Sequence, residues 1–161
     1  MAEPWLAIVW HSRTGASRAM AEAALDGAGS SARMLAAEAV TAEQLLTAAG
    51  YLFVCPENLG ALSGAMKEMF DRCYYPLLGR IEGRAYATAI AAGSAGHGAE
   101  AQLDRIVTGW RLRRVAESLI VNLHAQAPAE ILALKTVAPQ ELARCRDLAT
   151  ALAEGLRLGV F

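Results

Sequence analysis

Short apolar runs alternate with helical patterns along the whole chain, and no other feature of the sequence restricts its fold as strongly. The runs predict strands, which we place at residues 5–10, 32–36, 51–55, 84–92 and 118–123. Those at 5–10 and 51–55 are too short for helices and carry the branched and aromatic side chains typical of buried strands. Strands buried on both faces need helices above and below the sheet. The sequence therefore predicts an α/β fold with a parallel sheet.

Helical patterns separate these strands and follow the last one. The first pattern is rich in alanine and ends near two glycines, and Thr41 with Gln44 forms a capping box at the start of the second. We place the helices at residues 17–27, 41–50, 64–75, 99–110 and 139–158. Right-handed crossovers leave few orders for five parallel strands. We expect a doubly wound five-stranded sheet of order 2-1-3-4-5 in a single domain, residues 1–161.

The composition and the charge exclude several classes of protein. Hydrophobic residues make up 55% and charged residues 19% of the chain, which is typical of a globular domain. With a net charge of -1 and an isoelectric point near 6.3, the chain lacks the basic surface of a nucleic-acid-binding protein. Three unevenly spaced cysteines fit neither a disulfide framework nor a zinc site: Cys55, Cys73 and Cys145. No apolar run is long enough for a membrane span, so we expect a cytoplasmic protein.

The turn after the first strand has the residue types that bind an anion. It combines hydroxyl side chains with a glycine and with the free N–H groups at the start of a helix. The candidate phosphate contacts are Ser12, Arg13, Thr14, Gly15, Ala16 and Ser17. An ordinary strand-to-helix turn with a hydroxyl cap explains the same residues equally well. The turn has no Walker lysine, so it does not indicate a nucleoside triphosphate.

The loops after the third and fourth strands suit a flat ring, because glycine and small residues let backbone amides come close to it. In the expected strand order these loops lie beside the first one, at the edge where such sheets bind ligands. The candidate ring contacts after the third strand are Pro56, Glu57, Asn58, Leu59, Gly60 and Ala61. Those after the fourth strand are Gly93, Ser94, Ala95, Gly96 and His97. His97 could contact the ligand or be a polar residue of the loop.

Motifs in these loops resemble the flavodoxin and NAD(P)H-dependent FMN reductase superfamily. Residues 8–17 resemble the flavodoxin phosphate loop, with Trp10 where that pattern usually has Phe or Tyr and Ser17 where it usually has Thr. Ser17 keeps the hydroxyl that phosphate binding needs. Residues 56–71, which include Pro-Glu-Asn-Leu-Gly, resemble the reductase branch, and the glycine-rich loop at 93–98 matches in position.

The resemblance implies a flavoprotein that binds FMN, with the phosphate of FMN at residues 12–17 and its ring at 56–61 and 93–97. It also implies NAD(P)H as a co-substrate. Electron-carrier flavodoxins usually stack aromatic side chains on the flavin, whereas the two ring loops of this chain have none. An unstacked face leaves room for a nicotinamide or a quinone, which favours an enzyme over a carrier.

We therefore expect an FMN-dependent oxidoreductase that transfers hydride from NAD(P)H through FMN to a quinone, a flavin or a similar small acceptor. No catalytic side chain is assigned, because the flavin supplies the chemistry. The alternative is a non-enzymatic electron-transfer protein with a protein redox partner, and a third reading is a flavin-free interaction domain. A homodimer is expected, as in related reductases, from an apolar helix face containing Met66, Met69 and Phe70.

Overall fold

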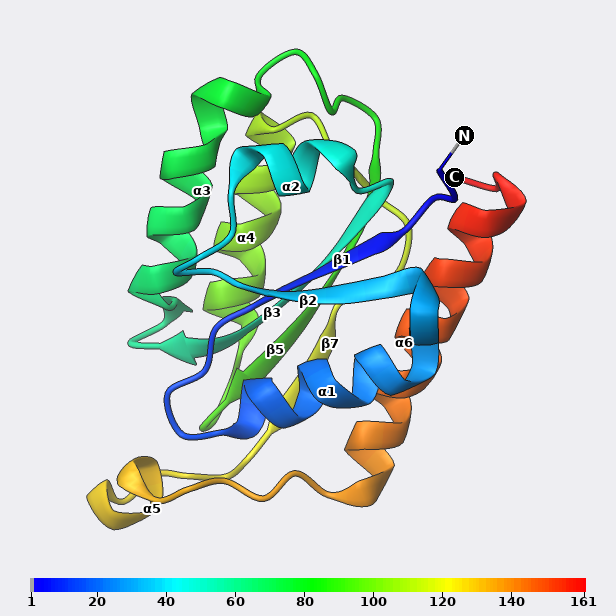
Figure 1. The fold of residues 1–161 in the computed structure, drawn as a ribbon. Helices are drawn as coiled ribbons and strands as arrows, with labels where there is room; N and C mark the ends of the chain where they lie inside the picture. The colour runs from blue at the N-terminus through cyan, green and yellow to red at the C-terminus, as the bar shows by residue number, and fades with distance from the viewer. Residues whose placement is uncertain (1) are drawn as a thin grey trace.

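A parallel sheet with helices on both faces forms the centre of the molecule in the computed structural model, which describes residues 2–161 (Figure 1). The strands run in the order β2, β1, β3, β5, and a fifth, edge position is shared by β6 and β7. Their bounds are Leu6–Trp10 for β1, Ala32–Ala36 for β2, Gly50–Asn58 for β3, Ala85–Ala92 for β5, Arg113–Arg114 for β6 and Leu119–Asn122 for β7. The predicted α/β fold and strand order are confirmed.

Two layers of helices cover the sheet. On one face lie α1 and α6, and on the other α2, α3 and α4. Their bounds are Ala16–Ala28 for α1, Ala42–Thr47 for α2, Gly64–Leu77 for α3, His97–Gly109 for α4 and Pro139–Leu158 for α6. Two short elements, the 3-10 turn η1 at Gly29–Ser31 and the helix α5 at Pro128–Leu132, lie outside these layers. The predicted capping box of α2 is present.

The cores on the two faces of the sheet differ in the size of their side chains. Beneath α3 and α4 the core is aromatic: the ring of Phe70 lies 5.0 Å from that of Phe53 and 5.1 Å from that of Trp110. Beneath α1 and α6 the core is aliphatic, and β5 contributes only small side chains to it, among them Ala87 and Ala89. Dense packing on both faces fixes the strand ends that carry the loops.

Several predicted boundaries were wrong. Strand β3 does not stop at Pro56 but continues to Asn58 and turns into the short antiparallel strand β4, Ala61–Leu62. Pro56 pairs with Ala91 of β5, but β1 ends opposite Val54. On that side no neighbouring strand needs the N–H that proline lacks. Helix α2 ends at Thr47, before the predicted 50, and α4 begins at His97, before the predicted 99.

The helix face that suggested a homodimer is part of the core. Met66, Met69 and Phe70 of α3 are at most 1% exposed and pack against the sheet. They are therefore not free to form an interface. Within residues 2–161, no helix combines the length and the apolar character that crossing a membrane requires.

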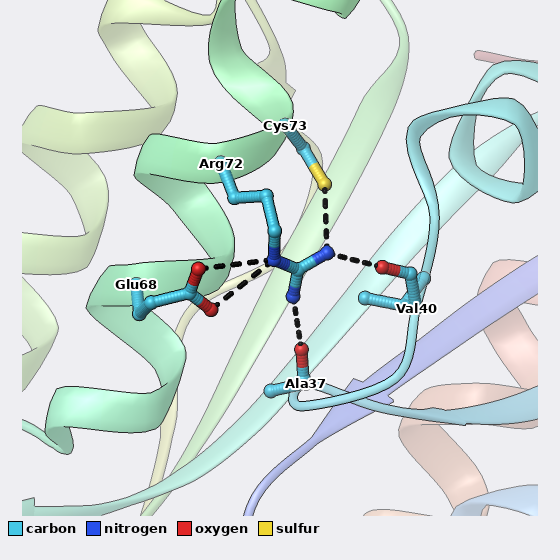
Figure 2. A network of polar contacts seen from close by, with 5 residues as sticks. All are labelled: Ala37, Val40, Glu68, Arg72 and Cys73. Atoms are coloured by element: carbon cyan, nitrogen blue, oxygen red, sulfur yellow. Dashed lines mark hydrogen bonds and ion pairs between the residues drawn. The ribbon is translucent and has the colours of Figure 1, made fainter.

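Arg72 ties α3 to the connection between β2 and α2 (Figure 2). Its guanidinium donates to the carbonyl oxygens of Ala37, at 2.7 Å, and of Val40, at 2.5 Å, while its Nε pairs with Glu68 one turn earlier. The two carbonyl groups belong to buried residues, so their hydrogen bonds come from the protein and not from water.

Candidate functional site

A cavity of about 490 Å³ opens where β1, β3 and β5 end, at the edge of the sheet where the sequence places the three candidate loops. The predicted residues that line it are Ser12, Arg13, Thr14, Ala16, Ser17, Pro56, Glu57, Asn58, Leu59, Gly60, Gly93 and Ser94. The predicted residues outside the lining are Gly15, Ala61, Ala95, Gly96 and His97. The volume falls within the range of small-molecule sites, roughly 300–1,000 Å³.

The first loop leads into α1 through a left-handed glycine and leaves the start of the helix uncapped. Gly15 has a φ of 97°, and its N–H donates to Ser12 Oγ at 3.0 Å, which folds the loop back on itself. No side chain of the described residues caps the first turn of α1. Ser17, in that turn, is 1% exposed and lines the cavity, and its Oγ has no hydrogen-bond partner within residues 2–161. Because Ser17 lines the cavity, this buried hydroxyl is available to hydrogen-bond a ligand bound there.

The loop after β3 is the tip of a two-residue hairpin between β3 and β4. Leu59 and Gly60 both have positive φ, 53° and 74°, as a tight hairpin turn requires. Glycine tolerates this conformation, but leucine is strained in it, and the Leu59 side chain is also fully exposed. A strained, exposed apolar side chain on the rim of a cavity is typical of a functional position.

Glu57 fastens this hairpin to the start of α4. One carboxylate oxygen accepts the N–H of Gly96 at 2.9 Å, and the other accepts that of Ala99 at 3.0 Å. Close packing strengthens the tie, because a Cβ on Gly98 would overlap the carbonyl oxygen of Gly60. Glu57 was predicted to contact the ligand ring. Glu57 lines the cavity, and its carboxylate neutralises the N-terminus of α4, whereas the N-terminus of α1 has no side-chain cap among the described residues.

The loop after β5 lies against the segment that follows β7. A Cβ on Gly93 would stand 2.8 Å from the carbonyl oxygen of Ala125, so only glycine permits this approach. Gly96 has a φ of 94° and occupies the N-cap position of α4, as Gly15 does in α1. The imidazole of His97 is 80% exposed and lies 3.2 Å from Glu100, away from the cavity lining. Of its two proposed readings, this geometry fits a polar surface residue.

Sequence reasoning missed the segment between β7 and α6, which supplies the remaining wall. Its residues that line the cavity are Leu123, Ala125, Ile131 and Lys135, and Ala91 of β5 completes the lining. Hydrogen bonds hold both ends of the segment, from Ala125 N–H to Gly93 O at 2.9 Å and from Lys135 N–H to Thr14 O at 2.8 Å. One signal was visible, because a connection this long is uncommon in α/β units.

Two titratable groups near the cavity are held in their neutral forms. Burial lowers the pKa of His11, against the opposing effect of Glu38, and its Nδ1 lies 2.8 Å from Ser63 Oγ. Burial also raises the pKa of the Cys55 thiol, at the end of β3, to about 12. A thiol with so high a pKa is not a nucleophile near neutral pH. The chemistry of the site therefore depends on what binds in the cavity.

A family model described as NADPH-dependent FMN reductase matches residues 34–127, more than half of the chain. This protein belongs to that flavodoxin-like, FMN-binding family. A flavodoxin from Aquifex aeolicus (strain VF5) is 31% identical over 105 residues, which are 63% of this chain and 57% of that protein. The chain thus matches less than two thirds of the length of this relative.

Solved structures share the fold. A flavodoxin from the domain Archaea has a TM-score of 0.75 at 16% identity, and the match covers 94% of this chain and 98% of that one. A flavodoxin, WrbA-like protein from Agrobacterium tumefaciens has a TM-score of 0.74 at 20% identity, covering 98% and 99% of the two chains. At these identities the likeness supports the fold alone.

Proposed function

We propose that this protein is an FMN-dependent oxidoreductase that takes hydride from NAD(P)H and passes electrons to a quinone, a flavin or a similar small acceptor. The observation that carries the proposal is the phosphate end of the cavity. There the uncapped N-terminus of α1 and the buried, unpartnered hydroxyl of Ser17 lie together. Both can donate hydrogen bonds to an anion with several acceptor oxygens, and the phosphate of FMN is one. Residues and cofactor therefore fit each other.

The ring of FMN would lie along the hairpin and the loop after β5. Backbone groups of residues 56–60 and of 93–94 border this part of the cavity, with the small side chains of Ala91 and Ala125. When bound, FMN supplies hydride acceptance and electron donation. The chain binds the phosphate, orients the ring and walls off water on one side.

Room for a second ring supports an enzyme. No aromatic side chain occurs among the described residues that line the cavity, so none would cover the flavin. A nicotinamide or a flat acceptor could then reach the exposed ring face. Three buried, unpaired thiols support a reducing compartment and thus a cytoplasmic location: Cys55, Cys73 and Cys145.

Absorbance spectroscopy tests the proposal. The purified protein, titrated with FMN and then mixed with NADPH in the absence of oxygen, should bind the flavin and bleach it within seconds. Ser17→Ala should weaken FMN binding, whereas Thr88→Val should not. Thr88 is the matched control, because its buried hydroxyl is also unpartnered but lies in β5, outside the cavity lining. Equal effects of the two substitutions would contradict the phosphate assignment.

An electron carrier is the second candidate, and the relative described as a flavodoxin favours it. The exposed Leu59 beside the cavity offers an apolar contact for a protein redox partner. Bound FMN that neither NADH nor NADPH reduces, but that a flavodoxin reductase does reduce, would decide for the carrier. A protein that binds no FMN would exclude both functions.

A further inference from the structure

A lysine in the segment between β7 and α6 lies at the phosphate end of the cavity. In Figure 1 this segment runs from β7 to α5 and returns to α6. Lys135 follows α5, and its backbone N–H donates to the carbonyl oxygen of Thr14 at 2.8 Å. This bond fixes Lys135 beside the loop that leads into α1, and Lys135, Thr14 and Ser17 all line the cavity.

The charge of Lys135 has no acidic partner. Its Nζ donates to two backbone carbonyl oxygens, those of Ile131 at 2.8 Å and Ala133 at 2.6 Å. Among residues 2–161, no carboxylate lies within ion-pair distance of this ammonium group. A half-buried cation held only by neutral acceptors is under-compensated, and an anion in the cavity would complete its coordination.

The other charged residues of the lining, Glu57 and Arg13, are less suited than Lys135 to bind an anion in the cavity. Among the described residues of the lining, Glu57 is the one carboxylate, and both of its oxygens accept N–H groups at the start of α4. Arg13 also lines the cavity, but it is exposed, so solvent and salt screen its charge more strongly than that of Lys135. The described lining therefore has two cations against one carboxylate, and Lys135 is the more shielded of the two cations.

We propose that Lys135 is a specificity residue that recognises the terminal phosphate of the flavin and so distinguishes FMN from riboflavin. The inference rests on the proposed function and deepens it. Because Lys135 also holds the carbonyl groups at the end of α5, phosphate binding by its ammonium group would compete with those bonds. Binding of FMN would then be coupled to the conformation of α5.

Flavin affinities measured by fluorescence quenching test this role. In Lys135→Met the affinity for FMN should fall about tenfold, as for the loss of one charge-assisted hydrogen bond, while that for riboflavin stays unchanged. Raising the salt from about 0.05 M to about 0.5 M should weaken FMN binding less in the variant than in the wild type. Lys135→Arg should recover most of the affinity for FMN. Lys67→Met is the control, because Lys67 lies on α3, outside the cavity lining, and pairs with Asp71 at 2.7 Å.

The outcomes separate the inference from the function on which it rests. If the wild type binds FMN and Lys135→Met binds it equally well, the role of Lys135 is wrong and the proposed function stands. If the variant loses affinity for FMN and riboflavin alike, Lys135 only shapes the wall, and the inference fails. If the wild type binds neither flavin, both the inference and the proposed function are overturned.

Discussion

Replacing Glu57 by glutamine tests whether the hairpin is held to α4 as the geometry indicates. The carboxylate accepts two backbone N–H groups, those of Gly96 at 2.9 Å and Ala99 at 3.0 Å. Glutamine keeps one acceptor oxygen, but it turns an NH₂ group toward the other N–H and removes the charge at the helix N-terminus. Hydrogen bonds to charged groups contribute about 1.5–3 kcal/mol each, and a charge at a helix terminus about 0.3–1 kcal/mol.

The expected loss of unfolding free energy for Glu57→Gln is therefore about 2–3 kcal/mol, or about 5–10 °C in Tm for a chain of this size. Chemical denaturation followed by circular dichroism measures it. Glu100→Gln is the matched control in the first turn of the same helix, where the carboxylate pairs with the exposed His97, and it should cost at most about 1 kcal/mol. Two variants of equal stability would refute the reasoning, because the position of the carboxylate would then not matter. FMN affinity should fall with stability in Glu57→Gln alone, since only Glu57 holds a loop of the cavity.

Three further substitutions test other contacts. Gly98→Ala should lower the free energy of unfolding by about 2 kcal/mol or more and weaken FMN binding, because its Cβ would overlap the hairpin tip. Gly109→Ala is the control: it has open space in the same helix and should be neutral or stabilising. Equal thermal melting temperatures of the two variants would contradict the close packing at Gly98. Arg72→Met should lower the free energy of unfolding in a urea titration by about 2 kcal/mol, because it leaves two carbonyl groups unpaired. Glu68→Gln, which removes the exposed ionic partner of Arg72, should cost under about 0.5 kcal/mol. The reverse ranking would contradict the network of Figure 2. The pKa of His11 is lowered in the folded state, so the contribution of His11 to stability is complete above the ordinary pKa near 6.5 and is lost as the pH falls below that value, by at most about 1.4 kcal/mol per pH unit. Denaturation at several pH values should show that the stability of His11→Gln falls less steeply with pH than that of the wild type. Parallel stability curves would exclude His11 as the cause.

The sequence predicted the sheet well because its central strands are continuous apolar runs. It predicted their order because parallel topologies are few. It failed where a strand lacks that pattern. Arg113 and Arg114 form β6 although both side chains are exposed, since an edge strand needs only one row of backbone partners, here Ala85 and Tyr86. Nothing in two arginines after a helix indicates a strand.

The candidate site was predictable in the parts that lie on loops between strongly patterned elements. The first loop and the hairpin could be placed because the strands before them are buried and the helices after them begin nearby. The role of Glu57 could not, because it depends on a hydrogen bond to an amide 39 residues away. Lys135 was missed for a similar reason: its partner Thr14 lies far away in the sequence, and only the folded structure brings the two together.

The close contact between α1 and α6 limits how this protein can be redesigned. A Cβ on Gly27 of α1 would overlap the backbone of Arg146 in α6, so these two helices meet main chain to main chain. Alanines of β5 fill the space below them. A methyl group added at Gly27 would displace a helix, because the nearest atoms that it meets belong to the backbone. The aromatic layer under α3 and α4 can absorb changes of shape by repacking its rings. Libraries aimed at new substrates should therefore vary the aromatic layer and the cavity loops. The contact between α1 and α6 and the alanines of β5 beneath it position Ser17, so they are better left unchanged.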